Sequence, residues 1–352
     1  CNLCVKLAAD HGFGSLRGFV NGVLRNIARN KDSIVFPDQE KDKRAYYSVM
    51  YSVPEELLEI LERDYDYETI DRILASGDSD RPTAIRVNTE KISVTAFSEK
   101  LRQNGITVER GSMNDTSLLI SGYDYIRKVP GFFDGEFVVQ DQSSCLAVKA
   151  AGINEGDLVV DVCAAPGGKT MYAAMLTGSE GHVISRDLID KKTELIEENI
   201  ERLGLSNVTV QVHDAREFDE ELTGKADVVI ADLPCSGLGI MGRKNDIKYH
   251  VSMESVKELA QLQREILDTV CRYVKPGGTL VYSTCTIDSI ENDENAVWFA
   301  DTHDFSLCGI DDVVPEHGGE RGFVTLHQGI DECDGFFISK FRADSNNQIG
   351  QE

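Results

Sequence analysis

Residues 158–170 read LVVDVCAAPGGKT, and this stretch decides the fold of the chain. The apolar run Leu158–Val160 ends in Asp161, a turn of small residues follows, and Lys169 and Thr170 open a helical pattern. In open α/β sheets, a strand, a glycine-rich turn and a helix in this order present backbone N–H groups to a ligand. The stretch therefore predicts a ligand-binding turn rather than an ordinary strand-to-helix connection.

Two kinds of phosphate-binding turn can be compared with this stretch. A P-loop requires G-x-x-x-x-G-K-[ST]. Gly168, Lys169 and Thr170 match its end, but Cys163 stands where the first glycine belongs. The dinucleotide fingerprint G-x-G-x-x-G is absent from this turn as well. The turn is more typical of a Rossmann-like sheet that binds S-adenosylmethionine, and a P-loop NTPase is the alternative enzyme class.

Composition sets further bounds. The chain has 352 residues, of which 41% are hydrophobic and 27% charged, as in a globular protein with room for several domains. No apolar run is long enough to span a membrane and no signal peptide opens the sequence, so we expect a cytoplasmic protein. The sequence begins at Cys1 without a methionine and inside a helical pattern, so we expect a fragment that lacks its natural N-terminus.

The cysteines and the charge point to particular classes of protein. Nine scattered cysteines favour reduced thiols, and Cys1-Asn-Leu-Cys4 lacks a second pair, so no metal site is expected. The net charge of −24 argues against a simple nucleic-acid binder, because phosphate neutralisation needs lysine and arginine. The charge is uneven, however: residues 1–31 are basic and the stretch after Asp288 is acidic. A local basic surface therefore still permits RNA binding.

Apolar periodicity divides the chain into an N-terminal helical part and a small mixed module. Residues 1–80 are expected to hold helices at 1–30 and two short helices within 54–75, with a linker at 78–82. Residues 81–142 are expected to form an α+β module of the ferredoxin-like kind, suited to RNA binding. Its predicted elements are strands at 83–88, 106–110 and 117–120 and a helix at 94–104.

The catalytic domain is expected at 143–342, followed by a tail at 343–352. A helix at 143–151 opens it, and strands and helices then alternate, which predicts a doubly wound parallel sheet. The expected strands are 158–161, 182–186, 208–212, 228–231, 279–283 and 335–341. The expected helices are 170–176, 191–203, 256–274 and 291–300. The last strand, GFFISKF, is expected to be the antiparallel edge.

Aspartates stand at the ends of successive predicted strands: Asp161, Asp187, Asp214 and Asp232. Ligands of open α/β sheets bind at the carboxyl ends of strands, and a carboxylate after the second strand is where a ribose diol is usually held. A solvated turn residue is the alternative for each aspartate alone. Their recurrence favours a ligand site.

Two cysteines stand at strand ends in a similar way. Cys235 lies in DLPCSGLG, residues 232–239, and Cys285 lies in YSTCT, residues 282–286. A buried structural cysteine is the alternative for each. As a pair beside a cofactor turn they favour nucleophilic catalysis. Attack of a thiolate on C6 of a pyrimidine makes C5 nucleophilic, which methyl transfer to C5 requires.

The motifs DVCAAPGGKT, DLPCSGLG, STCT and GFFISKF resemble the Sun/Fmu family of RNA cytosine-5 methyltransferases. HGFGSLRGFVNGVLRNI further resembles the end of the NusB-like helical domain of the branch that acts on small-subunit (16S) ribosomal RNA. The resemblance implies an S-adenosyl-L-methionine-dependent enzyme, expected as a monomer, with RNA as its partner. A catalytically silent RNA-binding or ribosome-assembly factor on the same fold is the alternative.

The resemblance also implies roles for individual residues. The turn that surrounds the methionine and ribose end of the cofactor would comprise Cys163, Ala164, Ala165, Pro166, Gly167, Gly168 and Lys169. Asp187 would bind the ribose hydroxyls, Asp214 would lie on the adenine side, and Asp232 would lie beside cofactor and cytosine. Cys285 would be the nucleophile and Cys235 would assist product release, although spacing alone leaves the reverse assignment open. Lys169 would lie close to the target base, and a solvent-exposed lysine at a helix start is its alternative.

Overall fold

The computed structural model describes residues 1–78, 81–315, 317 and 319–345. By its internal contacts the chain divides into two units, Cys1–Glu55 and Glu56–Glu352. Parts of the predicted linker at 78–82 and of the predicted tail at 343–352 lie outside the described residues.

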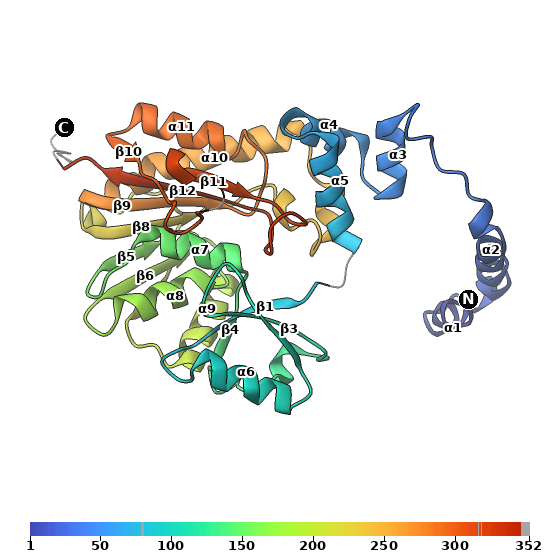
Figure 1. Cartoon of the computed structure of the whole chain (residues 1–352), viewed down its shortest axis with the longest axis horizontal. Coiled ribbons are helices and arrows are strands. Elements are labelled where there is room, and N and C mark those ends of the chain that lie inside the picture. Colours follow the sequence, from blue (N-terminus) through green and yellow to red (C-terminus); the bar gives the residue numbers. More distant parts are fainter. Residues whose placement is uncertain (79–80, 316, 318, 346–352) are drawn as a thin grey trace. The chain divides into compact units, whose positions relative to one another are not determined.

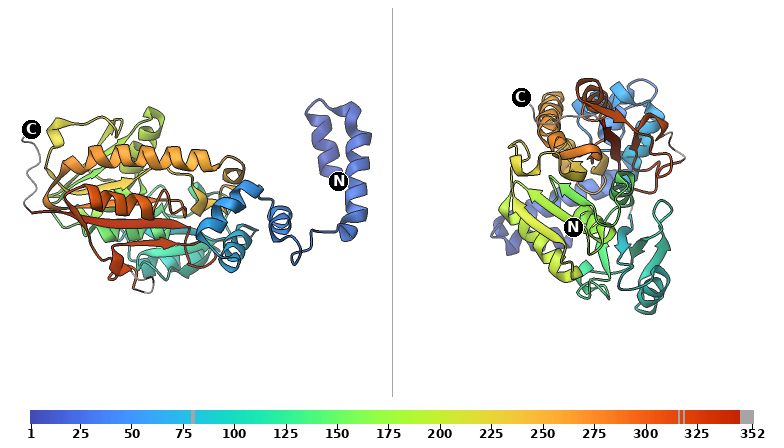
Figure 2. Two further views of the ribbon diagram at one scale, coloured as in Figure 1. Left: turned by 90° about the horizontal axis from the view of Figure 1, so that it is seen from above. Right: turned by 90° about the vertical axis from the view of Figure 1, so that its left-hand side faces the viewer.

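The first unit is helical, as predicted. It holds α1 (Asn2–Asp10), α2 (Arg17–Asn30) and α3 (Lys43–Met50). The expected helix at 1–30 is broken after α1, where Gly12 has a φ of +87°. The helices α1 and α2 lie side by side (Figure 2). Phe19, Val23 and Ile27, three apolar residues of α2, are exposed.

The second unit begins with α4 (Glu55–Asp64) and α5 (Tyr67–Ala75), the two predicted short helices. The small module follows, with β1 (Thr83–Val87), α6 (Val94–Gln103), β2 (Thr107–Arg110), β3 (Ser117–Ser121) and β4 (Phe137–Val139). Its antiparallel sheet has the order β2-β3-β1-β4. The helix packs Phe97 and Leu101 against this sheet, so the module has its own core.

The main sheet is doubly wound. Its order is β10-β12-β9-β8-β5-β6-β7, and β11 pairs with β12. The parallel strands are β5 (Leu158–Asp161), β6 (His182–Asp187), β7 (Val208–Val212), β8 (Ala226–Asp232) and β9 (Val274–Thr284). The antiparallel strands are β10 (Phe305–Leu307), β11 (Phe323–Leu326) and β12 (Phe336–Ala343).

Helices cover both faces of this sheet, as Figure 1 shows. α7 (Gln142–Ala151), α8 (Gly168–Thr177) and α9 (Asp190–Leu203) lie on one face, and α10 (Met253–Val270) and α11 (Asp293–Thr302) on the other. Alternate residues of one strand therefore enter different cores, since Val159 packs with α7 and α8 while Val160 packs with α10 and α11. Burial on both faces explains the continuous apolar runs in the sequence.

Three predictions about this domain are wrong. The helix expected at 256–274 ends at Val270, because Val274 already pairs with Ala226 as the first residue of β9. The strands β10 and β11 had no expected counterpart. β12 is antiparallel as predicted, yet it is not the edge, because β10 and β11 pair with its other side. Pairing between strands decides these three features of the fold. The short strands β10 and β11 carry little periodicity of their own by which the sequence could predict them.

Candidate active site

The glycine-rich turn is anchored to the neighbouring strand. Ala164 N–H donates to the carbonyl oxygen of Arg186 at 2.8 Å, and Ala165 N–H donates to Asp187 Oδ2 at 3.1 Å. Gly167 has a φ of +100°, and a Cβ there would lie 2.6 Å from Met171 Cε. The turn therefore needs a glycine at this position. It holds the start of α8 beside the carboxyl ends of β5 and β6.

The carboxylates at the ends of β5 and β6 are both buried. Asp161 accepts from Thr170 Oγ1 at 2.6 Å, and burial raises the pKa of Asp161 to about 7. Its other oxygen, Oδ1, has no hydrogen-bond partner among the described residues. Asp187 is 6% exposed. Lys192 Nζ lies 4.0 Å from Asp187 Oδ1.

Asp214 differs from the other aspartates of the predicted series. β7 ends at Val212, as predicted, and Asp214 lies in the loop just beyond it. Its carboxylate pairs with Arg216 at 2.6 Å, and this hydrogen bond lowers the pKa of Asp214. The carboxylate is already partnered within its own loop.

Lys169 and Asp232 form an ion pair across the site. Lys169 Nζ donates to Asp232 Oδ2 at 2.6 Å, and the lysine side chain is only 9% exposed. Ser283 Oγ donates to Asp232 Oδ1 at 2.9 Å. Burial by itself disfavours the ammonium, but the Asp232 carboxylate outweighs it and raises the pKa of Lys169. The solvent-exposed alternative for Lys169 is thus wrong.

The two thiols meet at the same edge of the sheet. β8 and β9 are parallel neighbours, and the chain beyond each brings Cys235 Sγ to 3.3 Å from Cys285 Sγ. The hydrogen bond with Cys285 and burial together raise the pKa of the Cys235 thiol, and the charge of Glu291 adds to the effect. Lys169, by contrast, interacts electrostatically with Cys285. The charges that act on the two thiols therefore differ: the Glu291 carboxylate acts on Cys235 and the Lys169 ammonium on Cys285.

Close backbone contact holds the Cys235 loop in place. Gly239 N–H donates to the carbonyl oxygen of Cys285 at 3.0 Å, and Gly335 N–H donates to that of Gly239 at 2.8 Å. A Cβ on Gly239 would lie 2.0 Å from the carbonyl oxygen of Gly335. Only glycine fits here.

Gly239→Ala should therefore lower the free energy of unfolding by about 2–3 kcal/mol, because backbone must move to admit the methyl group. Equilibrium urea unfolding measures this. Gly22→Ala is the matched control, since no atom lies within 4 Å of the added Cβ, and it should not destabilise the chain. Equal stability of the two variants would contradict the close packing.

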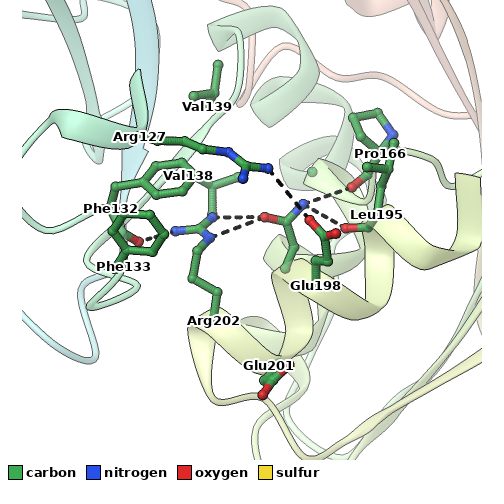
Figure 3. Close-up of a pocket in the computed structure, with 12 residues that line it drawn as sticks. Arg127, Phe132, Phe133, Val138, Val139, Pro166, Leu195, Glu198, Glu201 and Arg202 are labelled. Carbon is green, nitrogen blue, oxygen red and sulfur yellow. Dashed lines mark hydrogen bonds and ion pairs between the residues drawn. The ribbon is translucent and has the colours of Figure 1, made fainter. Parts of the chain in front are cut away.

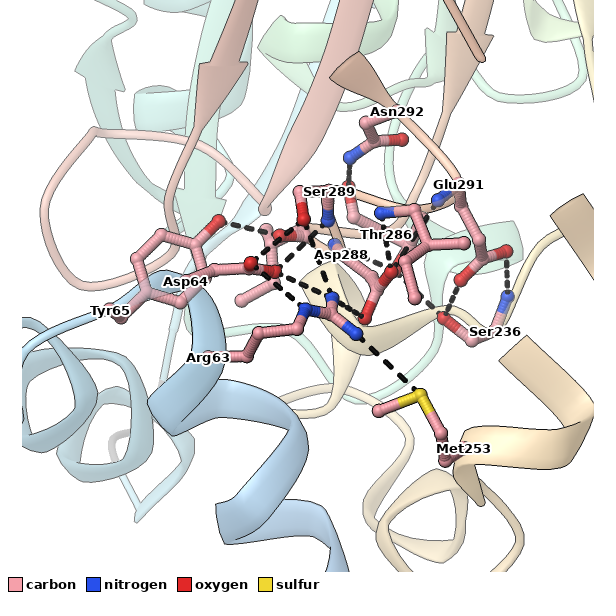
Figure 4. Close-up of polar contacts among 12 residues, drawn as sticks. Arg63, Asp64, Tyr65, Ser236, Met253, Thr286, Asp288, Ser289, Glu291 and Asn292 are labelled. Atoms are coloured by element: carbon pink, nitrogen blue, oxygen red, sulfur yellow. Dashed lines mark hydrogen bonds and ion pairs between the residues drawn. The ribbon is translucent and has the colours of Figure 1, made fainter. Parts of the chain in front are cut away.

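The polar residues that hold the loop after Cys285 were not predicted from the sequence. Figure 4 shows them. Arg63 Nη2 lies 2.7 Å from Asp288 Oδ2, and Ser289 Oγ donates to Asp64 Oδ1 at 2.7 Å. Glu291 is fully buried and binds Ser236. These acidic residues have the composition of a solvated segment, so only their position soon after Cys285 could have singled them out.

A cavity of about 680 Å³ lies where the small module meets the glycine-rich turn and α9, and Pro166 and Gly168 of that turn line it (Figure 3). Phe132, Phe133 and Arg127 line one side of it, and Asn199 and Arg202 the other. Neither thiol lines it. Arg202 Nη1 donates to the carbonyl oxygens of Phe132 and Phe137 at 2.8 and 2.9 Å, which fastens the module to α9.

The residues of the turn fit the cofactor that the sequence predicts. The free oxygen of Asp161 can accept a hydrogen bond from an ammonium group. Asp187, at the end of β6, has the carboxylate that ribose hydroxyls need. Ala164 and Ala165 keep side-chain bulk away from the backbone of the turn.

In the part of the chain that the structure describes, no helix is long and apolar enough to cross a membrane.

Comparison with known proteins agrees with this geometry. Residues 149–342 match the model of the 16S rRNA methyltransferase RsmB/F family, and residues 53–124 match that of its ferredoxin-like domain. The chain is 36% identical over 348 residues to the probable ribosomal RNA small subunit methyltransferase B of Bacillus subtilis, covering 96% of this chain and 76% of the relative. It is 32% identical to the Vibrio cholerae ribosomal RNA small subunit methyltransferase B, covering 95% and 74%.

Among solved structures, the crystal structure of PH0851 superposes with a TM-score of 0.85 at 27% identity, over 96% of this chain and 75% of that one. The chain therefore belongs to the 16S rRNA methyltransferase RsmB/F family, whose members use S-adenosylmethionine as the methyl donor.

Proposed function

We propose that this protein methylates C5 of a cytosine in small-subunit ribosomal RNA through a covalent bond between Cys285 and C6 of the base. The observation that carries the proposal is the pair of thiols, with Sγ atoms 3.3 Å apart, beside the buried Lys169–Asp232 ion pair. Cytosine C5 is a poor nucleophile, so its methylation needs a thiol that adds to the ring and a group that polarises the ring.

The reaction follows from what each side chain can do. The Cys285 thiolate adds to C6, and the electrons of the C5–C6 double bond make C5 nucleophilic. When bound, S-adenosylmethionine supplies an electrophilic methyl group, which becomes bonded to C5. A base then removes the C5 proton, the double bond forms again and the bond between C6 and Cys285 Sγ breaks. Asp232, held by Lys169 and Ser283, is placed to hydrogen-bond the cytosine ring.

The electrostatics favour Cys285 over Cys235 as the nucleophile. The Lys169 ammonium interacts electrostatically with Cys285. Cys235 shares a hydrogen bond with Cys285, in which either sulfur can be the donor. The pKa of the Cys235 thiol is raised, which favours its protonated form. Cys235 can therefore exchange a proton with Cys285 when the product is released. The sequence pattern left the two roles open, and this difference in charge supports one of them.

For the cofactor, we propose that the turn Cys163–Lys169 holds the methionine and ribose end and that Asp187 binds the ribose hydroxyls. Asp214 is proposed on the adenine side. Because the Asp214 carboxylate already pairs with Arg216, a cofactor that contacts this carboxylate would share its oxygen atoms with the arginine.

Transfer of a labelled methyl group to small-subunit ribosomal RNA tests the function. The RNA is digested to nucleosides, and 5-methylcytidine is expected as the labelled product. Label in any other nucleoside would contradict the proposed chemistry. Cofactor binding without any transfer, on naked RNA and on assembled small subunits, would favour the silent assembly factor.

We further propose that the small module contacts the RNA. Its surface carries two exposed rings: Phe133, which lines the 680 Å³ cavity and is 72% exposed, and Tyr125, which is 66% exposed. Lys128 Nζ lies 5.1 Å from the Tyr125 ring centre, and the exposed Arg127 lies 3.8 Å from Glu198. Unpaired bases stack on exposed aromatic rings, and cationic side chains attract phosphates.

Phe133→Ala should therefore weaken RNA binding about 5- to 30-fold, which corresponds to about 1–2 kcal/mol for one stacked base. Binding of a fluorescent RNA fragment measures the Kd, and cofactor binding should stay unchanged. Val35→Ala is the control, since that side chain is 91% exposed and lies outside the module. An unchanged Kd for Phe133→Ala would remove this ring from the RNA surface.

A further inference from the structure

The loops that carry the two thiols are joined by one buried carboxylate. Glu291 Oε2 accepts from Ser236 N–H at 2.9 Å, and Glu291 Oε1 accepts from Ser236 Oγ. Ser236 Oγ lies 2.8 Å from Thr286 Oγ1. Ser236 follows Cys235 and Thr286 follows Cys285, so this chain of hydrogen bonds ties the residue after one thiol to the residue after the other (Figure 4).

The rest of the surroundings keep Glu291 in this position. Gln263 Nε2, from α10, donates to Glu291 Oε2 at 2.9 Å and to the carbonyl oxygen of Pro234 at 2.9 Å. Glu291 is fully buried, so its carboxylate has no water-exposed alternative. Burial raises the pKa of Glu291 to about 7. The titratable groups around it are Asp288 of its own loop, Cys235 beyond β8 and Tyr282 of β9.

We propose that Glu291 is a positioning residue for the methyl-transfer site: its carboxylate holds the Cys235 loop against the Cys285 loop and places a negative charge beside the residue that follows Cys235. This inference rests on the proposed covalent mechanism and deepens it. Burying a carboxylate in a network with only neutral hydrogen-bond donors costs desolvation free energy. We take the presence of this buried charge as a sign that it has a role in the site.

The electrostatic consequence is a polarised pair of thiols. Lys169 interacts with Cys285, whereas Glu291 interacts with Cys235. A negative charge disfavours a nearby thiolate. Above a pH of about 7, where Glu291 is ionised, its charge therefore favours the protonated form of the Cys235 thiol. Protonated Cys235 can then return that proton to the Cys285 thiolate as the product leaves.

Two substitutions separate the charge from the hydrogen bonds. Glu291→Gln removes the charge but can keep every contact, since its oxygen can accept from Ser236 N–H and Gln263 while its amide donates to Ser236 Oγ. Glu291→Ala removes both and leaves those donors unpaired. Glu294→Gln is the matched control, because Glu294 is exposed and lies three residues further along the same segment.

The first measurement is the pH dependence of alkylation of Cys235 and Cys285 by iodoacetamide, read by peptide mass spectrometry on the intact, cofactor-free chain. In Glu291→Gln, Cys235 should be alkylated about tenfold faster at pH 8 than in the unmodified protein, because its thiolate is no longer opposed. Glu294→Gln should not change the rate. An unchanged Cys235 profile in Glu291→Gln would overturn the proposal.

The second measurement is steady-state methylation of the RNA. Glu291→Gln should lower kcat at least about tenfold with KM for RNA within twofold, and protein–RNA complex should accumulate on ordinary RNA because release is slowed. If the loss of activity came instead from a raised KM for RNA with kcat unchanged, Glu291 would have a merely structural role and the proposal would be contradicted. If the unmodified protein fails to methylate at all, the proposed function fails, and the alkylation profile still decides the role of Glu291.

Discussion

Cys285→Ala should abolish methyl transfer, with a fall in kcat of about 10⁴-fold or more, because the substitution removes the proposed nucleophile. With RNA that contains 5-fluorocytidine, the unmodified protein should stay covalently attached on a denaturing gel, since fluorine at C5 cannot leave as a proton does. Cys285→Ala should form no such adduct. Its binding of S-adenosylmethionine should be unchanged, because the cofactor turn lies on β5 and α8.

Cys235→Ala makes this test specific. It should still form the adduct, and on ordinary RNA it should accumulate a covalent complex. Cys308→Ala, at a cysteine beyond β10, controls for the loss of a thiol as such and should behave as the unmodified protein. An adduct lost only in Cys235→Ala would reverse the two roles while keeping the function. An adduct retained in Cys285→Ala and Cys235→Ala alike would contradict the covalent mechanism.

Asp232→Asn should lower kcat about 10²- to 10³-fold, the second largest effect expected for a substitution in this site. The reason lies in the buried ion pair. Lys169 has lost most of its hydration, and the carboxylate of Asp232 raises its pKa. With asparagine, only the smaller effects of Asp161 and Cys285 oppose burial of the ammonium, so the pKa of Lys169 should fall and the charge beside Cys285 should weaken. Single-turnover methylation measures the chemical step.

Stability provides the control for this prediction. Breaking a buried pair leaves an uncompensated charge, so Asp232→Asn should cost about 3 kcal/mol in the free energy of unfolding. The double variant Lys169→Met with Asp232→Asn removes both charges and should recover much of that stability without recovering activity. If Asp232→Asn keeps both full activity and full stability, the ion pair has no part in the reaction.

Local sequence determined the architecture of the catalytic domain. The apolar run before Asp161 and the glycine-rich turn before Thr170 predict strand, turn and helix, and the structure confirms them as β5 and α8. These features are local because a turn with positive φ requires glycine and a strand buried on both faces requires continuous apolar residues. The same reasoning failed at Val270, where the helix stops although the apolar pattern continues into β9.

By itself, the sequence determined the alternation of strands and helices from β5 to β9, the glycine-rich turn at Cys163–Lys169 and the placement of Cys235 and Cys285 beyond the ends of neighbouring strands. Only the tertiary structure decided how close the chain beyond the parallel strands β8 and β9 brings the two sulfur atoms, which lie 3.3 Å apart. It also decided that Lys169 and Glu291 are buried and Asp214 is paired with Arg216. Backbone preferences act between residues close in sequence, whereas burial and ion pairing depend on which strands lie together. The sequence around a charged residue does not indicate whether solvent or protein surrounds its side chain.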